Sequence, residues 1–113
     1  MKFKIFKFKS VTSTNDTAMS LIKEKKEIGC VYADNQTKGR GTYGKKWISN
    51  KGNLFGTVFF PLESKYPSFS EFSIINPVII SSVVRRFCRK KKVSLKWPND
   101  VFVDGKKICG ILQ

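Results

Sequence analysis

The run VSLKWPNDVFVDGKKICGIL, residues 93–112, decides the fold, because it contains three short apolar segments separated by two turns. Residues 93–96 predict a strand, and the following Trp-Pro-Asn-Asp sequence predicts a turn. Residues 101–103 and 107–112 flank Asp104-Gly105, and an Asp-Gly pair between apolar strands is a strong β-hairpin signal. We therefore expect antiparallel strands in this part of the chain.

The longest helix is expected just before this run. Apolar residues recur there at helical spacing as far as Phe87, which favours a helix that starts at Ser70 or Phe72. Pro77 is tolerable only near the first turn, because a proline further inside removes a backbone hydrogen bond.

The first third of the chain predicts a strand, a helix and a second strand. Lysine and apolar residues alternate over residues 1–9, but the phase of the apolar residues changes, so we expect a bulge or break near Ile5. Residues 13–16 offer several N-cap side chains for a short helix that runs to about Lys26. Residues 29–33 form a brief apolar strand.

A further strand is expected over residues 53–60, which are rich in β-branched and aromatic side chains and stop at Pro61. Helices and strands then follow one another without regular alternation. This order favours an α+β fold with a partly antiparallel sheet over a doubly wound parallel one.

The composition limits the class of protein. A chain of 113 residues makes one domain at most. Its 22 Lys and Arg against 8 Asp and Glu give a net charge of +14, which favours an anionic partner without choosing among nucleic acid, nucleotide and acidic protein. The densest basic run, residues 85–92, falls where the long helix should end, so a solvated helix terminus is favoured over a nucleic-acid patch.

Several classes are excluded or disfavoured. No apolar run approaches the roughly 20 residues of a membrane span, and the start has no secretory pattern, so we expect a cytoplasmic protein with no membrane association. Cys30, Cys88 and Cys109 lie in scattered apolar contexts that predict reduced core thiols. The absence of histidine excludes histidine-dependent triads and zinc sites of the histidine type within this chain.

A glycine-rich basic loop follows the strand at residues 29–33. Its sequence, GRGTYGKKW over residues 39–47, combines backbone amides that can approach an oxyanion with three cationic side chains. The glycine spacing is not that of a Walker loop or a dinucleotide-binding fingerprint. Together with Lys96 at the end of an apolar strand, the loop indicates a nucleotide-using ligase.

Three segments, in this order and spacing, resemble those of biotin protein ligases, the enzymes that attach biotin to carboxylases. They are Ser13-Thr14-Asn15, then QTKGRG at residues 36–41 with Gly44 and Trp47, and KWPND at residues 96–100 followed by Gly-Ile-Leu at residues 110–112. The resemblance covers nearly the whole chain. It implies an α+β fold of the class II aminoacyl-tRNA synthetase and biotin ligase type, with helices packed on a mixed, partly antiparallel sheet.

The resemblance implies a two-step activity that uses ATP, Mg²⁺ and biotin. The biotin carboxylate attacks the α-phosphate of Mg-ATP to form biotinyl-5′-AMP, and a carrier-protein lysine then displaces AMP. The expected partner is the biotin carboxyl carrier protein of acetyl-CoA carboxylase or a related carboxylase, with no protein-bound metal. One alternative is a lipoyl or octanoyl transferase or ligase of the same superfamily, which the KWPND segment disfavours. The second is a non-enzymatic basic nucleic-acid-binding module.

The site residues follow from the same resemblance. Lys96 should lie beside the biotin carboxylate and the adenylate phosphate, and Arg40 should embrace the mixed anhydride, so these two are the catalytic candidates. The expected biotin contacts are Ser13, Thr14, Asn15, Gln36, Arg40, Gly41, Thr42 and Lys96. The expected phosphate loop comprises Gly39, Arg40, Gly41, Thr42 and Gly44, and Trp47 and Trp97 should frame the pocket.

Each assignment has a structural alternative. Helix capping alone explains Ser13, Thr14 and Asn15, and Gln36 fits a plain polar loop residue. Arg40 fits a surface charge, Trp97 a core residue, and Lys96 a lysine whose stem is buried while its ammonium reaches water.

The chain also departs from the family pattern. Thr42 and Tyr43 stand where a further arginine is common, so Lys45 is the candidate to supply that charge. Residues 1–113 are expected to be a catalytic domain that is incomplete at the C-terminus. We expect no N-terminal winged helix and no C-terminal β domain. Without a winged helix, no specific DNA binding is expected.

Overall fold

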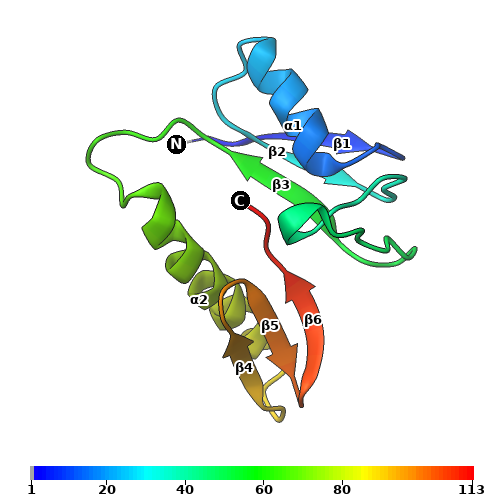
Figure 1. Cartoon of the computed structure of the whole chain (residues 1–113), viewed down its shortest axis with the longest axis vertical. Coiled ribbons are helices and arrows are strands. Elements are labelled where there is room, and N and C mark those ends of the chain that lie inside the picture. The colour runs from blue at the N-terminus through cyan, green and yellow to red at the C-terminus, as the bar shows by residue number, and fades with distance from the viewer. Residues whose placement is uncertain (1) are drawn as a thin grey trace. The chain divides into compact units, whose positions relative to one another are not determined.

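The computed structural model describes residues 2–113, which divide into one unit that ends at Glu63 and a second that begins at Ser64 (Figure 1). Among these residues, each unit holds one α-helix and one three-stranded sheet. The expected α+β class with partly antiparallel strands is therefore confirmed.

The first unit has a mixed sheet with strand order β1-β2-β3. Its elements are β1 Lys4–Phe8, α1 Thr14–Lys23, β2 Gly29–Ala33, a 3₁₀ turn Thr42–Gly44 and β3 Phe55–Phe59. The central strand β2 pairs in parallel with β1 and antiparallel with β3. α1 packs against β2 and β3, and buried Ala18, Val31 and Phe59 form the core between them.

The bulge expected near Ile5 is wrong. β1 pairs with β2 in unbroken register from Lys4 to Phe8. Phe6 and Phe8 pack against the core cluster, whereas Ile5 points the other way and is 71% exposed. The apparent change of phase arose because both faces of this strand carry apolar side chains.

The second unit contains α2 Phe69–Phe87 and the antiparallel sheet β4-β5-β6. Its strands are β4 Val93–Lys96, β5 Asp100–Val103 and β6 Lys106–Gly110, and α2 contacts β4 and β5. The expected hairpin is confirmed: Asp104 and Gly105 join β5 to β6 with φ values of 49° and 74°. Positive φ at both central residues is what a type I′ hairpin turn requires.

The start of α2 differs from the sequence expectation. Ser68 is the N-cap and forms a capping box with Glu71, so the helix begins at Phe69 and Pro77 lies inside its 19 residues. An interior proline costs about 3 kcal/mol through the lost hydrogen bond and ring crowding. The helix tolerates it because the capping box fixes the first turn and the Pro77 ring is buried against the unit.

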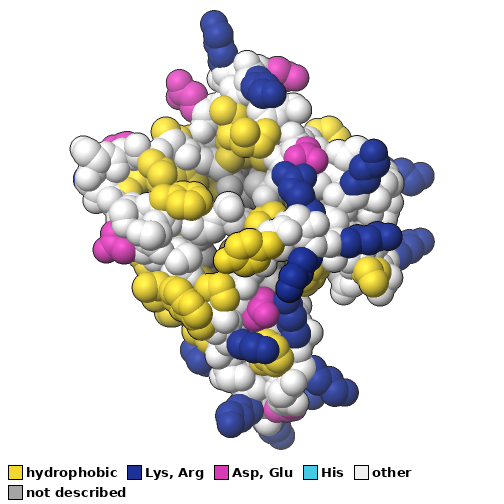
Figure 2. Space-filling view, viewed as in Figure 1, with side chains coloured by type: hydrophobic (Ala, Val, Ile, Leu, Met, Phe, Trp, Pro, Cys, Tyr) yellow, Lys and Arg dark blue, Asp and Glu magenta, His cyan; other side chains and the backbone are white. Residues whose placement is uncertain are grey.

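The surface is strongly cationic. In Figure 2, dark-blue Lys and Arg side chains gather mainly in the right and lower parts of the view, while magenta Asp and Glu are sparse. The basic run at residues 85–92 comprises the last residues of α2 and the residues that follow it. It is exposed apart from the half-buried Cys88. The three cysteines are free thiols, as expected, but each is half-buried rather than fully inside a core. Within residues 2–113, no helix has the length and apolarity of a membrane span.

Candidate functional site

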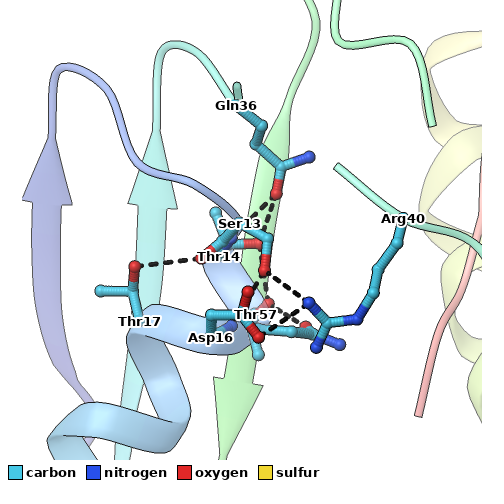
Figure 3. A network of polar contacts seen from close by, with 8 residues as sticks. Ser13, Thr14, Asp16, Thr17, Gln36, Arg40 and Thr57 are labelled. Atoms are coloured by element: carbon cyan, nitrogen blue, oxygen red, sulfur yellow. Dashed lines mark hydrogen bonds and ion pairs between the residues drawn. The ribbon is translucent and has the colours of Figure 1, made fainter. Parts of the chain in front are cut away.

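The polar residues at the start of α1 form a partly buried cluster (Figure 3). Ser13 has an extended backbone and caps the helix, because its Oγ accepts a 3.0 Å hydrogen bond from the Asp16 amide. Ser13 and Thr14 are only 2% and 5% exposed. The capping interpretation of Ser13 is thus correct, and its burial also places the hydroxyl inside a wider hydrogen-bond network.

Gln36 joins this cluster from the segment after β2. The Thr37 amide donates to the Val11 carbonyl, so residues 36 and 37 run beside the segment that leads into α1. Gln36 Oε1 then accepts from the Thr14 amide at 2.8 Å and from Thr14 Oγ1 at 3.2 Å. Its Nε2 donates to Ser49 Oγ at 3.2 Å. Gln36 is therefore a fixed part of the cluster rather than a solvated loop residue.

Thr57 of β3 completes the cluster and was missed by sequence reasoning. Its Oγ1 lies 2.9 Å from Thr14 Oγ1 and also reaches Asn15 Oδ1. One hydroxyl proton can serve only one of these two acceptors at a time. A signal was present, because Thr57 is the polar residue between the buried Phe55 and Phe59 on the face of β3 that packs toward the core.

The glycine-rich loop closes on itself through backbone hydrogen bonds. The Gly41 amide donates to the Lys45 carbonyl at 2.6 Å, and the Trp47 amide donates to the Gly39 carbonyl at 2.9 Å. At the tip, Tyr43 and Gly44 have φ values of 56° and 70°, and the Tyr43 side chain is 99% exposed. One amide expected to meet a phosphate, that of Gly41, is therefore already bonded within the loop in this conformation.

Gly39 is required by close packing at the base of the loop. An added Cβ would lie 2.7 Å from Ser49 Oγ, 2.9 Å from Gln36 Nε2 and 2.9 Å from the Trp47 carbonyl oxygen. No side chain fits in this space without movement of a backbone carbonyl. The loop and the Gln36 cluster are thus packed directly against each other.

Arg40 connects the loop to the helix. Its Nη1 lies 2.7 Å from Asp16 Oδ1 and donates to Ser13 Oγ at 3.3 Å. The hydrogen bond from Arg40 holds the pKa of the Asp16 carboxyl below its usual value; partial burial opposes this shift, and the hydrogen bond with Ser13 adds to it. Asp16 was considered from sequence only as a helix cap, so its contact with Arg40 is new information.

Lys96 and Trp97 lie in the second unit. Lys96 ends β4 and is exposed, with its Nζ 6.0 Å from the centroid of the Phe102 ring. Trp97 is 69% exposed, so the core-residue alternative for it is wrong, and the Trp97–Pro98 peptide is cis. Asn99 holds the chain beyond β6, because its Nδ2 donates to the Ile111 carbonyl and its own carbonyl accepts from the Ile111 amide, both at 2.9 Å.

A second lysine of this unit was missed by sequence reasoning. The β5–β6 hairpin brings Lys107 Nζ to 2.9 Å from Oδ1 of Asp100, the last residue of KWPND. That oxygen is buried and has no aligned hydrogen-bond donor among residues 2–113, so the contact is a charge pair rather than a directed hydrogen bond. Burial, with a smaller contribution from Asp100, raises the pKa of the nearby Cys109 thiol, while Lys107 opposes the shift.

The structure therefore brings together six of the residues selected from sequence, all in the first unit: Ser13, Thr14, Asn15, Gln36, Gly39 and Arg40. Gly41, Thr42, Gly44 and the half-buried Trp47 complete the adjoining loop. The expected approach of Lys96 to Arg40 stays a prediction. Residues 2–113 contain no cluster of three or more His, Cys, Asp or Glu side chains that could hold a metal ion.

Comparison with known proteins identifies relatives. Over 103 residues the chain is 34% identical to the bifunctional ligase/repressor BirA of Escherichia coli. The matched region covers 90% of this chain and 32% of that protein. It is 30% identical over 101 residues to a biotin–[acetyl-CoA-carboxylase] ligase of Paracoccus denitrificans, with 88% and 42% covered. The chain thus spans less than half of the length of these relatives.

Comparison with solved structures also finds biotin protein ligases. The chain matches the biotin protein ligase of Aquifex aeolicus in complex with biotin and ATP with a TM-score of 0.78 at 32% identity, over 96% of this chain and 45% of that one. The Leishmania major biotin protein ligase in complex with biotin gives a TM-score of 0.76 at 32% identity, over 96% and 50%. A sequence model of the Biotin/lipoate A/B protein ligase family matches residues 5–113, and the chain belongs to that family.

Proposed function

We propose that this chain is part of the catalytic domain of a biotin protein ligase, which activates biotin with ATP and transfers it to a carrier protein. The observation that carries the proposal is the partly buried cluster of neutral hydrogen-bonding groups at the start of α1, with the Arg40 guanidinium at its edge. Neutral groups and a cation side by side suit a ligand with a neutral polar head and an anionic end.

The neutral groups match the ureido ring of biotin. That ring presents two N–H donors and one carbonyl acceptor, which call for a small set of uncharged partners. One network supplies both hydrogen-bond donors and acceptors from hydroxyl and amide groups, on Ser13, Thr14, Asn15 and Gln36. When a ureido group binds, its hydrogen bonds would replace bonds that these side chains now make with one another. The side chains would therefore lose little bound water on binding.

The cations suit the first chemical step. A carboxylate must approach the α-phosphate of ATP, and fixed positive groups must stabilise the charge that develops at phosphorus. Arg40 and the Gly39–Gly44 loop are proposed to surround the acyl-phosphate junction and to exclude water from the adenylate. Mg²⁺ enters with the ATP phosphates as part of the substrate.

Two lysines of the second unit are candidates for the positive charge that this step requires. Lys96 is the candidate from the resemblance, but its side chain is exposed and has only a distant ring contact. The Lys107 side chain is also exposed, at 40%, but its Nζ lies 2.9 Å from Asp100 Oδ1, and a charge that is held in advance stabilises a transition state better than a mobile one. The proposal therefore includes both residues, and substitution separates them.

In the second step a lysine of a biotin carboxyl carrier protein displaces AMP and forms an amide with biotin. The proposed partner is the carrier of acetyl-CoA carboxylase or a related carboxylase, and the proposed location is the cytoplasm. The net charge of +14 would speed its encounter with any anionic partner or substrate.

The test is the formation of biotinyl-5′-AMP from biotin and ATP, followed by chromatography of the labelled nucleotide. Lys96→Ala and Lys107→Ala are compared with Lys51→Ala, which alters an exposed turn. Loss of the lysine that meets the junction should lower the rate by about 100-fold or more. If biotin binds normally and both variants still form the adenylate at the unmodified rate, the electrostatic mechanism is wrong.

A lipoyl or octanoyl ligase is the second candidate, because the family that includes this chain also includes lipoate ligases. Lipoate and octanoate carry no ureido group, so they could not form the hydrogen bonds that a ureido ring can make with Thr14 and Gln36. That mismatch disfavours them. A nucleic-acid-binding function would instead rest on the exposed run at residues 85–92 and would show steep salt dependence in RNA titrations.

A further inference from the structure

Arg40 is held at one nitrogen only. Among residues 2–113, its contacts with Asp16 and Ser13 both run through Nη1, at 2.7 and 3.3 Å. Nη2 and Nε are left for another acceptor, and a guanidinium presents its remaining donors in a fixed plane. Figure 3 shows the Arg40 side chain extending to Ser13 and Asp16 at the N-terminal end of α1.

We propose that Asp16 is a positioning residue, which holds Arg40 and through it the loop at residues 39–47 against α1 before any ligand arrives. The loop has internal backbone bonds, and the Arg40 side chain extends from it to Asp16 in the first turn of the helix. An anchored Arg40 does not have to be ordered when a phosphate binds, so part of the entropic cost is met in the free protein. This inference rests on the proposed function for its ligand, but not for its geometry.

This anchor matters more because Thr42 and Tyr43 stand where biotin protein ligases commonly carry a further arginine. Neither side chain supplies a cation there, and Tyr43 points fully into solvent. Arg40 is then a cation that the loop already holds in place, and Asp16 limits its motion. The pair is about half-exposed on both sides, so its effect is modest rather than large.

Amide hydrogen exchange in the ligand-free chain tests the anchor. The probes are the Gly41 and Trp47 amides, whose bonds to Lys45 and Gly39 close the loop. Asp16→Asn and Arg40→Gln should each speed their exchange by about twofold to fivefold, the range for an exposed ion pair. The double variant should be no faster than either single one. Glu24→Gln, which removes a carboxylate from the other end of α1, is the control.

A helix-only role for Asp16 gives a different pattern. It would speed exchange of the α1 amides and leave Gly41 and Trp47 as in the Glu24→Gln control. That result, or single effects that multiply in the double variant, overturns the proposal. Asp16→Glu keeps the charge and should restore part of the protection, whereas a purely steric role would not distinguish it from Asp16→Asn.

A second measurement follows the ligand. A non-hydrolysable biotinyl-AMP analogue should dissociate about twofold to fivefold faster from Asp16→Asn than from the unmodified chain. Faster loop exchange with an unchanged dissociation rate would overturn the link between the anchor and ligand retention. If the analogue does not bind the unmodified chain, the proposed function fails, while the exchange data still decide whether Asp16 holds the loop.

Discussion

Replacing Gly39 with alanine tests the packing between the loop and the polar cluster. The added Cβ would lie at least 0.5 Å inside the ordinary contact distance of 3.4 Å to three atoms, one of which is the Trp47 carbonyl oxygen. A backbone carbonyl cannot rotate away as a flexible side chain can. Overpacking of this kind costs about 1–3 kcal/mol, and loss of the Gln36–Ser49 hydrogen bond adds about 1 kcal/mol.

Gly41→Ala is the matched control two residues away. Its added Cβ would meet the Lys45 carbonyl at 3.7 Å and the Trp47 ring at 4.0 Å, both ordinary contacts, and its φ of −102° suits any residue. Urea unfolding should therefore show Gly39→Ala destabilised by about 2–4 kcal/mol and Gly41→Ala within about 0.5 kcal/mol of the unmodified chain. Equal stability of the two variants would refute the reasoning.

Three further outcomes are expected. Because the folded-state pKa of Asp16 is lowered, its charge stabilises the fold above its usual pKa of 3.8 and stops doing so as pH falls through the lower folded value. The difference in unfolding midpoint between the unmodified chain and Asp16→Asn should therefore shrink below pH 3.8; an unchanged difference would contradict the shift. Alkylation of Cys109, followed by mass spectrometry, should show an inflection above the usual thiol pKa of 9.0, and an inflection below it would contradict the effect of burial. Asn99→Ala should destabilise the second unit by about 1 kcal/mol in urea unfolding, because its Nδ2 holds the Ile111 carbonyl, whereas Asn76→Ala removes only an exposed contact and should have less effect.

Local signals in the sequence predicted most of the elements. β2 occupies the expected residues 29–33, since a short apolar run between turn signals leaves little choice. Asp104-Gly105 fixed the last hairpin because few other residues accept two positive φ values in succession. The start of α2 was placed too late because the penalty for Pro77 was given more weight than the capping box at Ser68 and Glu71.

The missed site residues depend on contacts that the sequence pattern does not reveal. Thr57 meets Thr14 across 43 positions, and only the packing of α1 on β3 places them together. Asp16 looked like one of several N-cap residues until the loop brought Arg40 to it. Lys107 was one of two adjacent lysines in a strand, and the strand register decided which of them reaches Asp100.

The most direct test of the central claim is calorimetric titration of the chain with biotin and, separately, with lipoate. Thr57→Val keeps the size of the side chain but removes the hydroxyl that meets Thr14 and Asn15, so it probes the neutral cluster specifically. The proposal predicts saturable binding of one biotin per chain, no comparable heat with lipoate, and biotin affinity weakened in Thr57→Val by about 10-fold. Absence of biotin binding, or equal binding of lipoate, would contradict the assignment of this site to biotin.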